Sequence, residues 1–208
     1  EKLNHKEAGE YIADFVGPLG RPTEVEGLKK VCVVGGGVGC AIALPVAKEL
    51  AALGCEVTSI IGFRTKDLVI LEDEFKAASK NFYMMTDDGS YGIRGFTTNQ
   101  LKALIDSGIR YDRVVAIGPA PMMKFVCAVT EPYGIKTIVS LNPIMIDGTG
   151  MCGGCRVAVD GKTQFACVDG PEFDGHLVDW DELIKRNSYY REEEAAHVCR
   201  LTGGVRHG

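Results

Sequence analysis

The fold of this chain is decided by Lys30-Val-Cys-Val-Val-Gly-Gly-Gly-Val-Gly39. The β-branched run Lys30–Val34 predicts a buried strand that the glycines end, and an apolar helical pattern follows from Cys40 to Leu53. Glycines between a strand and a helix let the backbone approach a phosphate, to which the helix N-terminus offers partial positive charge. The stretch therefore indicates nucleotide binding, with a plain strand-to-helix turn as the alternative. The residues predicted to form this site are Gly35, Gly36, Gly37, Val38 and Gly39.

Strands and helices alternate through the following hundred residues. Helices are expected over Leu68–Lys80 and Thr97–Ser107, and another opens after Gly118. This alternation predicts an α/β fold with a five-stranded, doubly wound parallel sheet. The four further strands are expected at Glu56–Ile61, Asn81–Met85, Asp112–Ile117 and Lys136–Leu141.

Two basic residues, Arg64 and Lys66, follow the second predicted strand. An acid near this position would bind the ribose of NAD, whereas a basic residue accommodates the 2′-phosphate of NADP. Arg64 is therefore a candidate for nucleotide binding, and the absence of an acid favours NADP(H). Solvated surface charges would give the same pattern.

A second motif lies in Asp147-Gly-Thr-Gly-Met-Cys152-Gly-Gly-Cys155, with Cys167 further along. The pattern D-x4-C-x2-C-x11-C resembles the cysteine spacing of a plant-type [2Fe–2S] site, with aspartate in place of the first thiolate. The glycines let the loop wrap closely and turn its N–H groups toward sulfur. A disulfide, a structural zinc site and a C-x2-C redox motif are the alternatives.

The residues around this motif resemble a known family. The segments are Leu141-Asn-Pro-Ile-Met-Ile-Asp-Gly-Thr-Gly-Met-Cys-Gly-Gly-Cys-Arg156 and Phe165-Ala-Cys-Val-Asp-Gly-Pro-Glu-Phe-Asp-Gly-His176. They are similar to the small subunit of NADH-dependent ferredoxin:NADP oxidoreductase, to sulfide dehydrogenase subunits and to the electron-transfer subunit of dihydroorotate dehydrogenase. The resemblance implies an oxidoreductase subunit whose [2Fe–2S] ligands are Asp147, Cys152, Cys155 and Cys167.

The same resemblance implies the other cofactors and the partners. It places Asp87 and Asp88 beside an NAD(H) or NADP(H) molecule, although such residues more often form turns. It also places Gly118, Pro119 and Met122 in the wall of that site. FAD would be held by a β-barrel of the full-length parent, so this chain alone is expected to lack flavin turnover. Electrons would pass to a larger iron–sulfur flavoprotein subunit or to ferredoxin.

Four regions are expected. Residues 1–27 would contain a strand over Glu10–Val16 and a linker left from the missing barrel, and residues 28–141 would form the NAD(P)-binding domain. Residues 142–178 would form the cluster subdomain around a hairpin of Arg156–Val159 and Thr163–Ala166. Residues 179–208 would form a C-terminal arm that docks on the sheet or on a partner, with disorder over residues 203–208.

Composition narrows the class of protein. The 208 residues are 46% hydrophobic and 25% charged, with a net charge of −5 and no basic run, which argues against nucleic acid binding. The apolar runs are too short to span a membrane, and without a leader pattern we expect the cytoplasm. The alternative function is a zinc-stabilised nucleotide-binding or subunit-interaction domain without redox activity.

Overall fold

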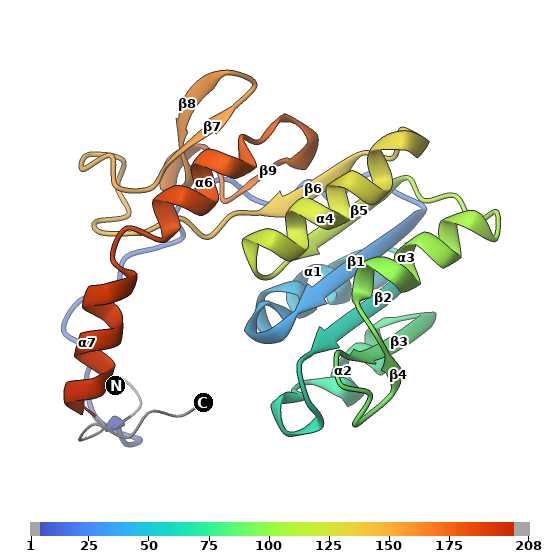
Figure 1. Cartoon of the computed structure of the whole chain (residues 1–208), viewed down its shortest axis with the longest axis horizontal. Coiled ribbons are helices and arrows are strands. Elements are labelled where there is room, and N and C mark those ends of the chain that lie inside the picture. Colours follow the sequence, from blue (N-terminus) through green and yellow to red (C-terminus); the bar gives the residue numbers. More distant parts are fainter. Residues whose placement is uncertain (1–4, 202–208) are drawn as a thin grey trace.

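The computed structural model describes the backbone of residues 5–201 and contains a seven-stranded sheet in the order β4-β3-β2-β1-β5-β6-β9 (Figure 1). All neighbours pair in parallel except β9, which is antiparallel to β6. A separate antiparallel hairpin joins β7 (Arg156–Val159) to β8 (Lys162–Phe165). The strands of the large sheet are β1 (Lys30–Gly36), β2 (Glu56–Phe63), β3 (Asn81–Thr86), β4 (Ile93–Arg94), β5 (Arg113–Ile117), β6 (Thr137–Ser140) and β9 (Glu172–Asp174).

Helices cover both faces of this sheet, because the apolar residues of its central strands alternate in direction. Val31 and Val33 pack with α1 and α2, whereas Cys32 and Val34 pack with the residues of α3, α4 and α6. Within residues 5–201, no helix has the length and apolar character that a bilayer span requires. The helices are α1 (Cys40–Ala52), α2 (Glu72–Ala78), α3 (Thr97–Asp106), α4 (Ala120–Thr130), α5 (Ala166–Asp169), α6 (Trp180–Asn187) and α7 (Arg191–Leu201).

The predicted fold class is confirmed, and the five predicted strands form the centre of the sheet. The count of five strands is wrong, because β4 and β9 add one strand at each edge. These strands have only two and three residues, too few for an alternating pattern to show in the sequence. Their pairing is decided by the neighbouring strand rather than by their own residues.

The strand predicted over Glu10–Val16 is also wrong. This segment is irregular, and Tyr11 and Phe15 are each 90% exposed. A strand needs a neighbour to accept its backbone hydrogen bonds, and no neighbour lies beside this segment among the described residues. Further along, the chain is bound to the body, where Arg21 N donates to Gly170 O at 2.6 Å.

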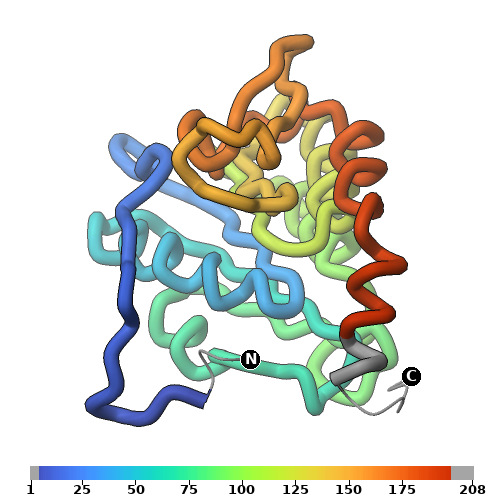
Figure 2. The backbone as a smooth tube through the Cα atoms, turned by 90° about the vertical axis from the view of Figure 1, so that its left-hand side faces the viewer, coloured from blue at the N-terminus to red at the C-terminus, as the bar shows by residue number. Residues whose placement is uncertain are grey.

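The C-terminal region divides into two unlike helices. Helix α6 belongs to the body: Leu183 is 2% exposed, and Trp180 Nε1 donates to Gly175 O at 3.0 Å. Helix α7 projects away from the sheet (Figure 1), and the N-terminal segment and α7 lie at opposite edges of the same face of the molecule (Figure 2). The disorder predicted for residues 203–208 lies outside the described residues. The C-terminal arm was expected to dock on the sheet or on a partner. Its first helix, α6, docks on the body that contains the sheet.

Burial of Leu183 predicts a large cost for its truncation. We expect Leu183→Ala to lower the free energy of unfolding by about 3 kcal/mol, because it leaves a cavity between α6 and the body. Urea denaturation followed by circular dichroism measures this loss. Lys185→Ala, at an exposed position of the same helix, should stay within about 0.5 kcal/mol of the unmodified chain. Equal stability of both variants would show that α6 is detachable.

Glu172 in β9 predicts a pH-dependent stability. Burial raises its pKa, although the Thr23 hydroxyl donates to Oε1 at 2.7 Å and Arg113 also favours the charged form. A raised pKa means that the folded chain holds the Glu172 proton more tightly than the unfolded chain, so the ionised carboxylate costs stability at neutral pH.

We therefore expect Glu172→Gln, which can still accept from Thr23, to raise the Tm at neutral pH. This advantage should shrink as the pH falls and vanish below the ordinary glutamate pKa of 4.5, where both the folded and the unfolded wild-type chains are protonated at Glu172. Thermal unfolding across pH measures the difference. The exposed Glu26→Gln is the control, and a Tm difference for Glu172→Gln that does not change with pH would contradict the prediction.

Candidate functional site

The cluster loop, residues 147–155, is organised around the Asp147 carboxylate. Oδ1 accepts from Thr149 N at 2.6 Å, and Oδ2 accepts from Cys152 N at 2.8 Å. Hydrogen bonds from the Thr149 N–H and from Cys152 hold the pKa of Asp147 below its usual range. The carboxylate is therefore ionised and held beside the exposed Cys152, as a ligand to a cation needs to be.

The other two predicted ligands, Cys155 and Cys167, are in direct contact. Their sulfur atoms lie 3.2 Å apart, and Cys167 N donates to Cys155 Sγ at 3.5 Å. Both side chains are buried, at 2% and 7% exposure. The Cys155 thiol is the main cause that raises the pKa of Cys167. The β7–β8 hairpin brings together two residues that are twelve positions apart.

Backbone N–H groups of the loop point at the sulfurs of Cys152 and Cys167. Gly154 N donates to Cys152 Sγ at 3.3 Å, and the Gly150 N–H bonds the Cys167 thiol and lowers its pKa. Gly150 has a φ of +86°, and a Cβ there would lie 2.7 Å from Val168 Cγ2, so this turn requires glycine. The Gly150 contact joins the Asp147–Cys152 pair to the Cys155–Cys167 pair.

The donor set fits an iron–sulfur cluster in its chemistry. Three thiols and one carboxylate supply four outer ligands, and thiolates are the ligands that iron–sulfur clusters take. The four side chains are arranged as the two pairs described, and among the side chains that the structure describes no three acidic, cysteine or histidine groups converge on one point. The structure thus places all four predicted ligands on one loop and hairpin.

The remaining cysteines described in the structure are core residues. Burial raises the pKa of Cys40 and of Cys127 to about 12, which keeps both thiols protonated and inert. Cys32 and Cys55 are buried as well. The exposed Cys152 and the paired Cys155 and Cys167 are chemically distinct from this group.

A pocket of about 600 Å³ opens at the carboxyl edge of the parallel strands. Open α/β sheets bind nucleotides at this edge. Its polar lining includes the Arg64 and Asp87 side chains and the backbone of Gly36 and Gly37. Six of the residues predicted for the nucleotide site line it: Gly36, Gly37, Arg64, Asp87, Pro119 and Met122.

Five predicted residues do not line this pocket, and two of them are needed for packing. A Cβ on Gly39 would lie 2.6 Å from Ile117 O and 2.7 Å from Gly118 Cα, so the first turn of α1 packs on the β5–α4 loop only through glycine. Gly35 is buried at the end of β1, and Val38 is 82% exposed. The glycine-rich stretch therefore shapes the pocket partly through backbone packing.

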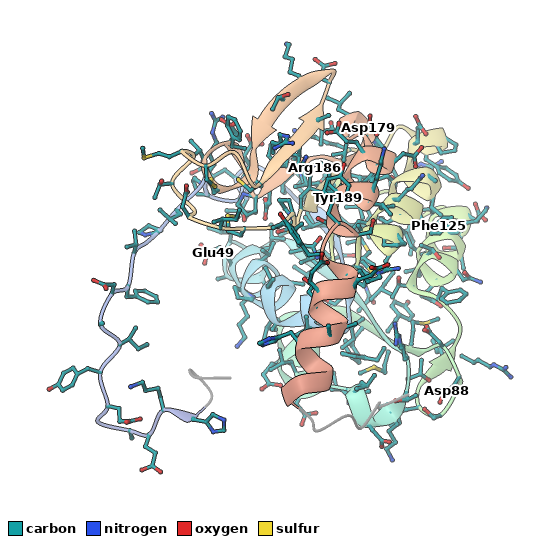
Figure 3. All side chains as sticks on the ribbon, turned by 60° about the vertical axis from the view of Figure 1, so that its left-hand side comes forward. Glu49, Asp88, Phe125, Asp179, Arg186 and Tyr189 are labelled. Carbon is teal, nitrogen blue, oxygen red and sulfur yellow. The ribbon has the colours of Figure 1, made fainter. Side chains whose placement is uncertain are left out.

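Asp88 forms a turn instead of lining the pocket. Its Oδ1 accepts from Ser90 N at 2.9 Å and from Ser90 Oγ at 2.7 Å, and these bonds hold its pKa below the usual range. Lys66 N donates to the same Ser90 Oγ at 2.9 Å, which ties the loop after β2 to the loop after β3. Asp88 on this turn and Phe125 on α4 are labelled in Figure 3.

Sequence reasoning missed the apolar wall of the pocket. The available signal was the position of large apolar residues just after strands or on the outward side of helices. In the structure Phe96 is 61% and Phe125 is 62% exposed. Such residues are costly on a bare surface and suit the walls of a ligand site. The missed lining residues include Phe63, Leu68, Phe96, Thr97, Thr98 and Phe125.

Comparisons with known proteins identify relatives of this chain. Residues 142–179 match the family model described as the iron–sulfur cluster binding domain of dihydroorotate dehydrogenase B. The Thermotoga maritima homologue of the dihydroorotate dehydrogenase B (NAD(+)) electron-transfer subunit is 50% identical over 193 residues, covering 93% of this chain and 68% of that protein. An uncharacterized Clostridium beijerinckii protein is 49% identical over 207 residues, covering 96% of this chain and 70% of that protein.

A solved structure of an NADH-dependent reduced ferredoxin-NADP oxidoreductase is also similar. It superimposes with a TM-score of 0.88 at 45% identity, covering 97% of this chain and 72% of that chain. The likeness extends over the sheet, the cluster loop and the C-terminal helices together. This chain therefore belongs to the family of dihydroorotate dehydrogenase B electron-transfer subunits and their homologues, and it is an electron-transfer module of an oxidoreductase.

Proposed function

We propose that this chain transfers electrons between NAD(P)H and a [2Fe–2S] cluster held by Asp147, Cys152, Cys155 and Cys167. The observation that carries the proposal is the contact between the Cys155 and Cys167 sulfurs, 3.2 Å apart, beside a loop whose N–H groups point at sulfur. Two buried thiols that lie side by side and are not linked could both serve as ligands of one metal centre. The count of four donors and their spacing support the [2Fe–2S] type.

The pocket is the proposed site for the dinucleotide. Gly36 and Gly37 allow a pyrophosphate to approach the backbone, and Arg64 and Asp87 are the charged groups that can select a ribose or its phosphate. The apolar wall excludes water from the nicotinamide. Both NADH and NADPH suit such a pocket, and Arg64 is the residue that would favour the additional phosphate.

The two proposed sites face the same edge of the sheet. Strand β6 runs parallel to β5 and β1, so its C-terminal end at Ser140 lies on the edge where β1 ends at Gly36. The cluster loop follows β6 almost directly. This shared edge supports a short path between nucleotide and cluster.

FAD of the full-length parent is the proposed electron carrier between the nucleotide and the cluster. A flavin can take up two electrons as a hydride and give them up one at a time, and a cluster of this kind takes one electron at a time. We place its barrel upstream of residues 28–141, which bind the nucleotide, and of residues 142–178, which hold the cluster. The chain spans about 70% of the length of its relatives, which leaves room for such a part. The proposed partner is a larger iron–sulfur flavoprotein subunit, with ferredoxin as a further acceptor in the cytoplasm.

Metal analysis tests the cluster directly. We expect about two irons per chain after anaerobic purification, with a visible absorption that dithionite bleaches. Cys155→Ser should lose most of this iron because its oxygen is a poorer ligand than a thiolate. Cys55→Ser, at a buried thiol outside the site, should keep it. One zinc per chain and no chromophore would contradict the proposal and support a structural zinc domain.

Nucleotide titration tests the pocket. We expect Arg64→Ala to raise the Kd for NADPH about tenfold, because a charged hydrogen bond to the 2′-phosphate contributes about 1.5 kcal/mol or more. The Kd for NADH should change little. Lys66→Ala is the matched control, since the Lys66 ammonium lies 5.5 Å from the centre of the Tyr91 ring and does not line the pocket. An equal loss for both nucleotides would refute the assigned role of Arg64.

A further inference from the structure

Two arginines hold the outer side of the ligand turn between Cys152 and Cys155. Arg156 Nη1 donates to Gly153 O at 3.3 Å, and Arg186 Nη2 donates to Gly154 O at 3.2 Å. In a trans peptide the carbonyl and the following N–H point in opposite directions. The carbonyls of both glycines therefore face guanidinium groups, and the next N–H groups are turned the other way.

The peptide between Gly153 and Gly154 shows this effect. Its carbonyl is held by Arg156, and its N–H, on Gly154, donates to Cys152 Sγ at 3.3 Å. The next peptide has its carbonyl held by Arg186, which turns the Cys155 N–H away from the arginine. By holding the carbonyls, the two arginines therefore also turn the N–H groups toward the side of the ligands.

Arg186 differs from Arg156 in where it comes from. Arg156 is exposed and adjoins the turn in sequence, whereas Arg186 is partly buried and reaches the loop from 32 residues away. It lies where α6 leads into α7, near Tyr189, whose ring centre is 5.9 Å from its guanidinium carbon (Figure 3). Arg186 therefore ties the ligand turn to a separate element of the body.

Helix α6 is itself firmly held, so this tie is to a fixed point. Asp179 caps its N-terminus, with Oδ1 accepting from Glu182 N at 2.9 Å, and Asp179 N donates to Ala158 O in β7 at 2.9 Å. Leu183, one turn before Arg186, is buried. The guanidinium is consequently presented to Gly154 O by a helix anchored to both the hairpin and the body.

We propose that Arg186 is a positioning residue for the metal site: it holds the Cys152–Cys155 turn in its ligand-binding shape and supplies a fixed positive charge behind it. The inference rests on the proposed cluster, and it assigns a role to a residue outside the ligand motif. A general effect of basic residues at the end of α6 is the competing explanation, because cations there also interact favourably with the helix dipole. Lys185 is exposed in the same helix turn, so its substitution distinguishes the two explanations.

The test compares Arg186→Ala, Arg186→Lys and Lys185→Ala in anaerobically purified protein. We expect Arg186→Ala to release iron to a chelator about tenfold faster than the unmodified chain, as loss of a group supporting metal ligands commonly does. The rate of iron release from Arg186→Lys should lie between the rates of Arg186→Ala and the unmodified chain, since an ammonium keeps the charge but lacks the planar fork of a guanidinium. Lys185→Ala, which removes the same charge from the same turn, should match the unmodified chain.

Two further readouts do not depend on activity. The midpoint potential of the cluster should fall in Arg186→Ala and stay unchanged in Lys185→Ala, because a cation near the site stabilises the reduced, more negative state. In metal-free protein, the Gly154 N–H, which donates to Cys152 Sγ, should exchange with solvent deuterium faster in Arg186→Ala than in Lys185→Ala, because its turn is no longer held. This second readout tests Arg186 even if the cluster itself proves absent, so the two proposals fail separately.

Equal iron release and equal exchange of the Gly154 N–H in Arg186→Ala and Lys185→Ala would overturn the proposal. Circular dichroism and Tm establish that each variant is folded. If Arg186→Ala does not fold, Arg186→Lys compared with Lys185→Ala decides: faster release in the lysine variant supports the role, and equal release refutes it.

Discussion

The candidate metal site depends on one constraint, the closure of the β7–β8 hairpin that brings Cys155 against Cys167. Ala166 N donates to Cys155 O at 3.1 Å at the base of the hairpin, next to the pair Arg156 and Phe165. This register places the two thiols side by side. The loop with Asp147 and Cys152 then has to reach only the pair formed by Cys155 and Cys167 to complete the set of four candidate ligands.

The hairpin is in turn fixed to the rest of the molecule. Val159 forms a bridge with Val178, and Asp160 N donates to Leu177 O at 2.8 Å, so the segment before α6 lies beside β7. Helix α6 packs its apolar side on the body and sends Arg186 back to the ligand turn. The candidate metal site is therefore supported by elements that contain none of its four candidate ligands.

The pocket proposed for the nucleotide has a different physical basis. It exists because parallel strands end at one edge, where the loops after β1, β2, β3 and β5 meet. Gly39 and Gly118 allow two of these loops to touch through their backbones. This chain thus combines a candidate site formed by strand ends with a candidate site formed by a hairpin, joined through β6.

The sequence by itself determined the α/β class, the central strands and the four candidate metal ligands. These features are local: a strand shows in its run of β-branched residues, and a cluster motif shows in the spacing of Cys152 and Cys155. The same locality explains the wrong strand over Glu10–Val16, because an extended apolar pattern cannot show whether a neighbouring strand is there to pair with it.

Only the tertiary structure decided which residues meet across long separations. Asp87 lines the pocket and Asp88 turns away to Ser90, although the two are adjacent in sequence. Phe125 and Arg186 acquire their places from the packing of α4 and α6, which no residue pattern near the motifs encodes. The physical reason is that burial and hydrogen bonding depend on distances between elements, and those distances arise only when the sheet, the hairpin and the helices pack together.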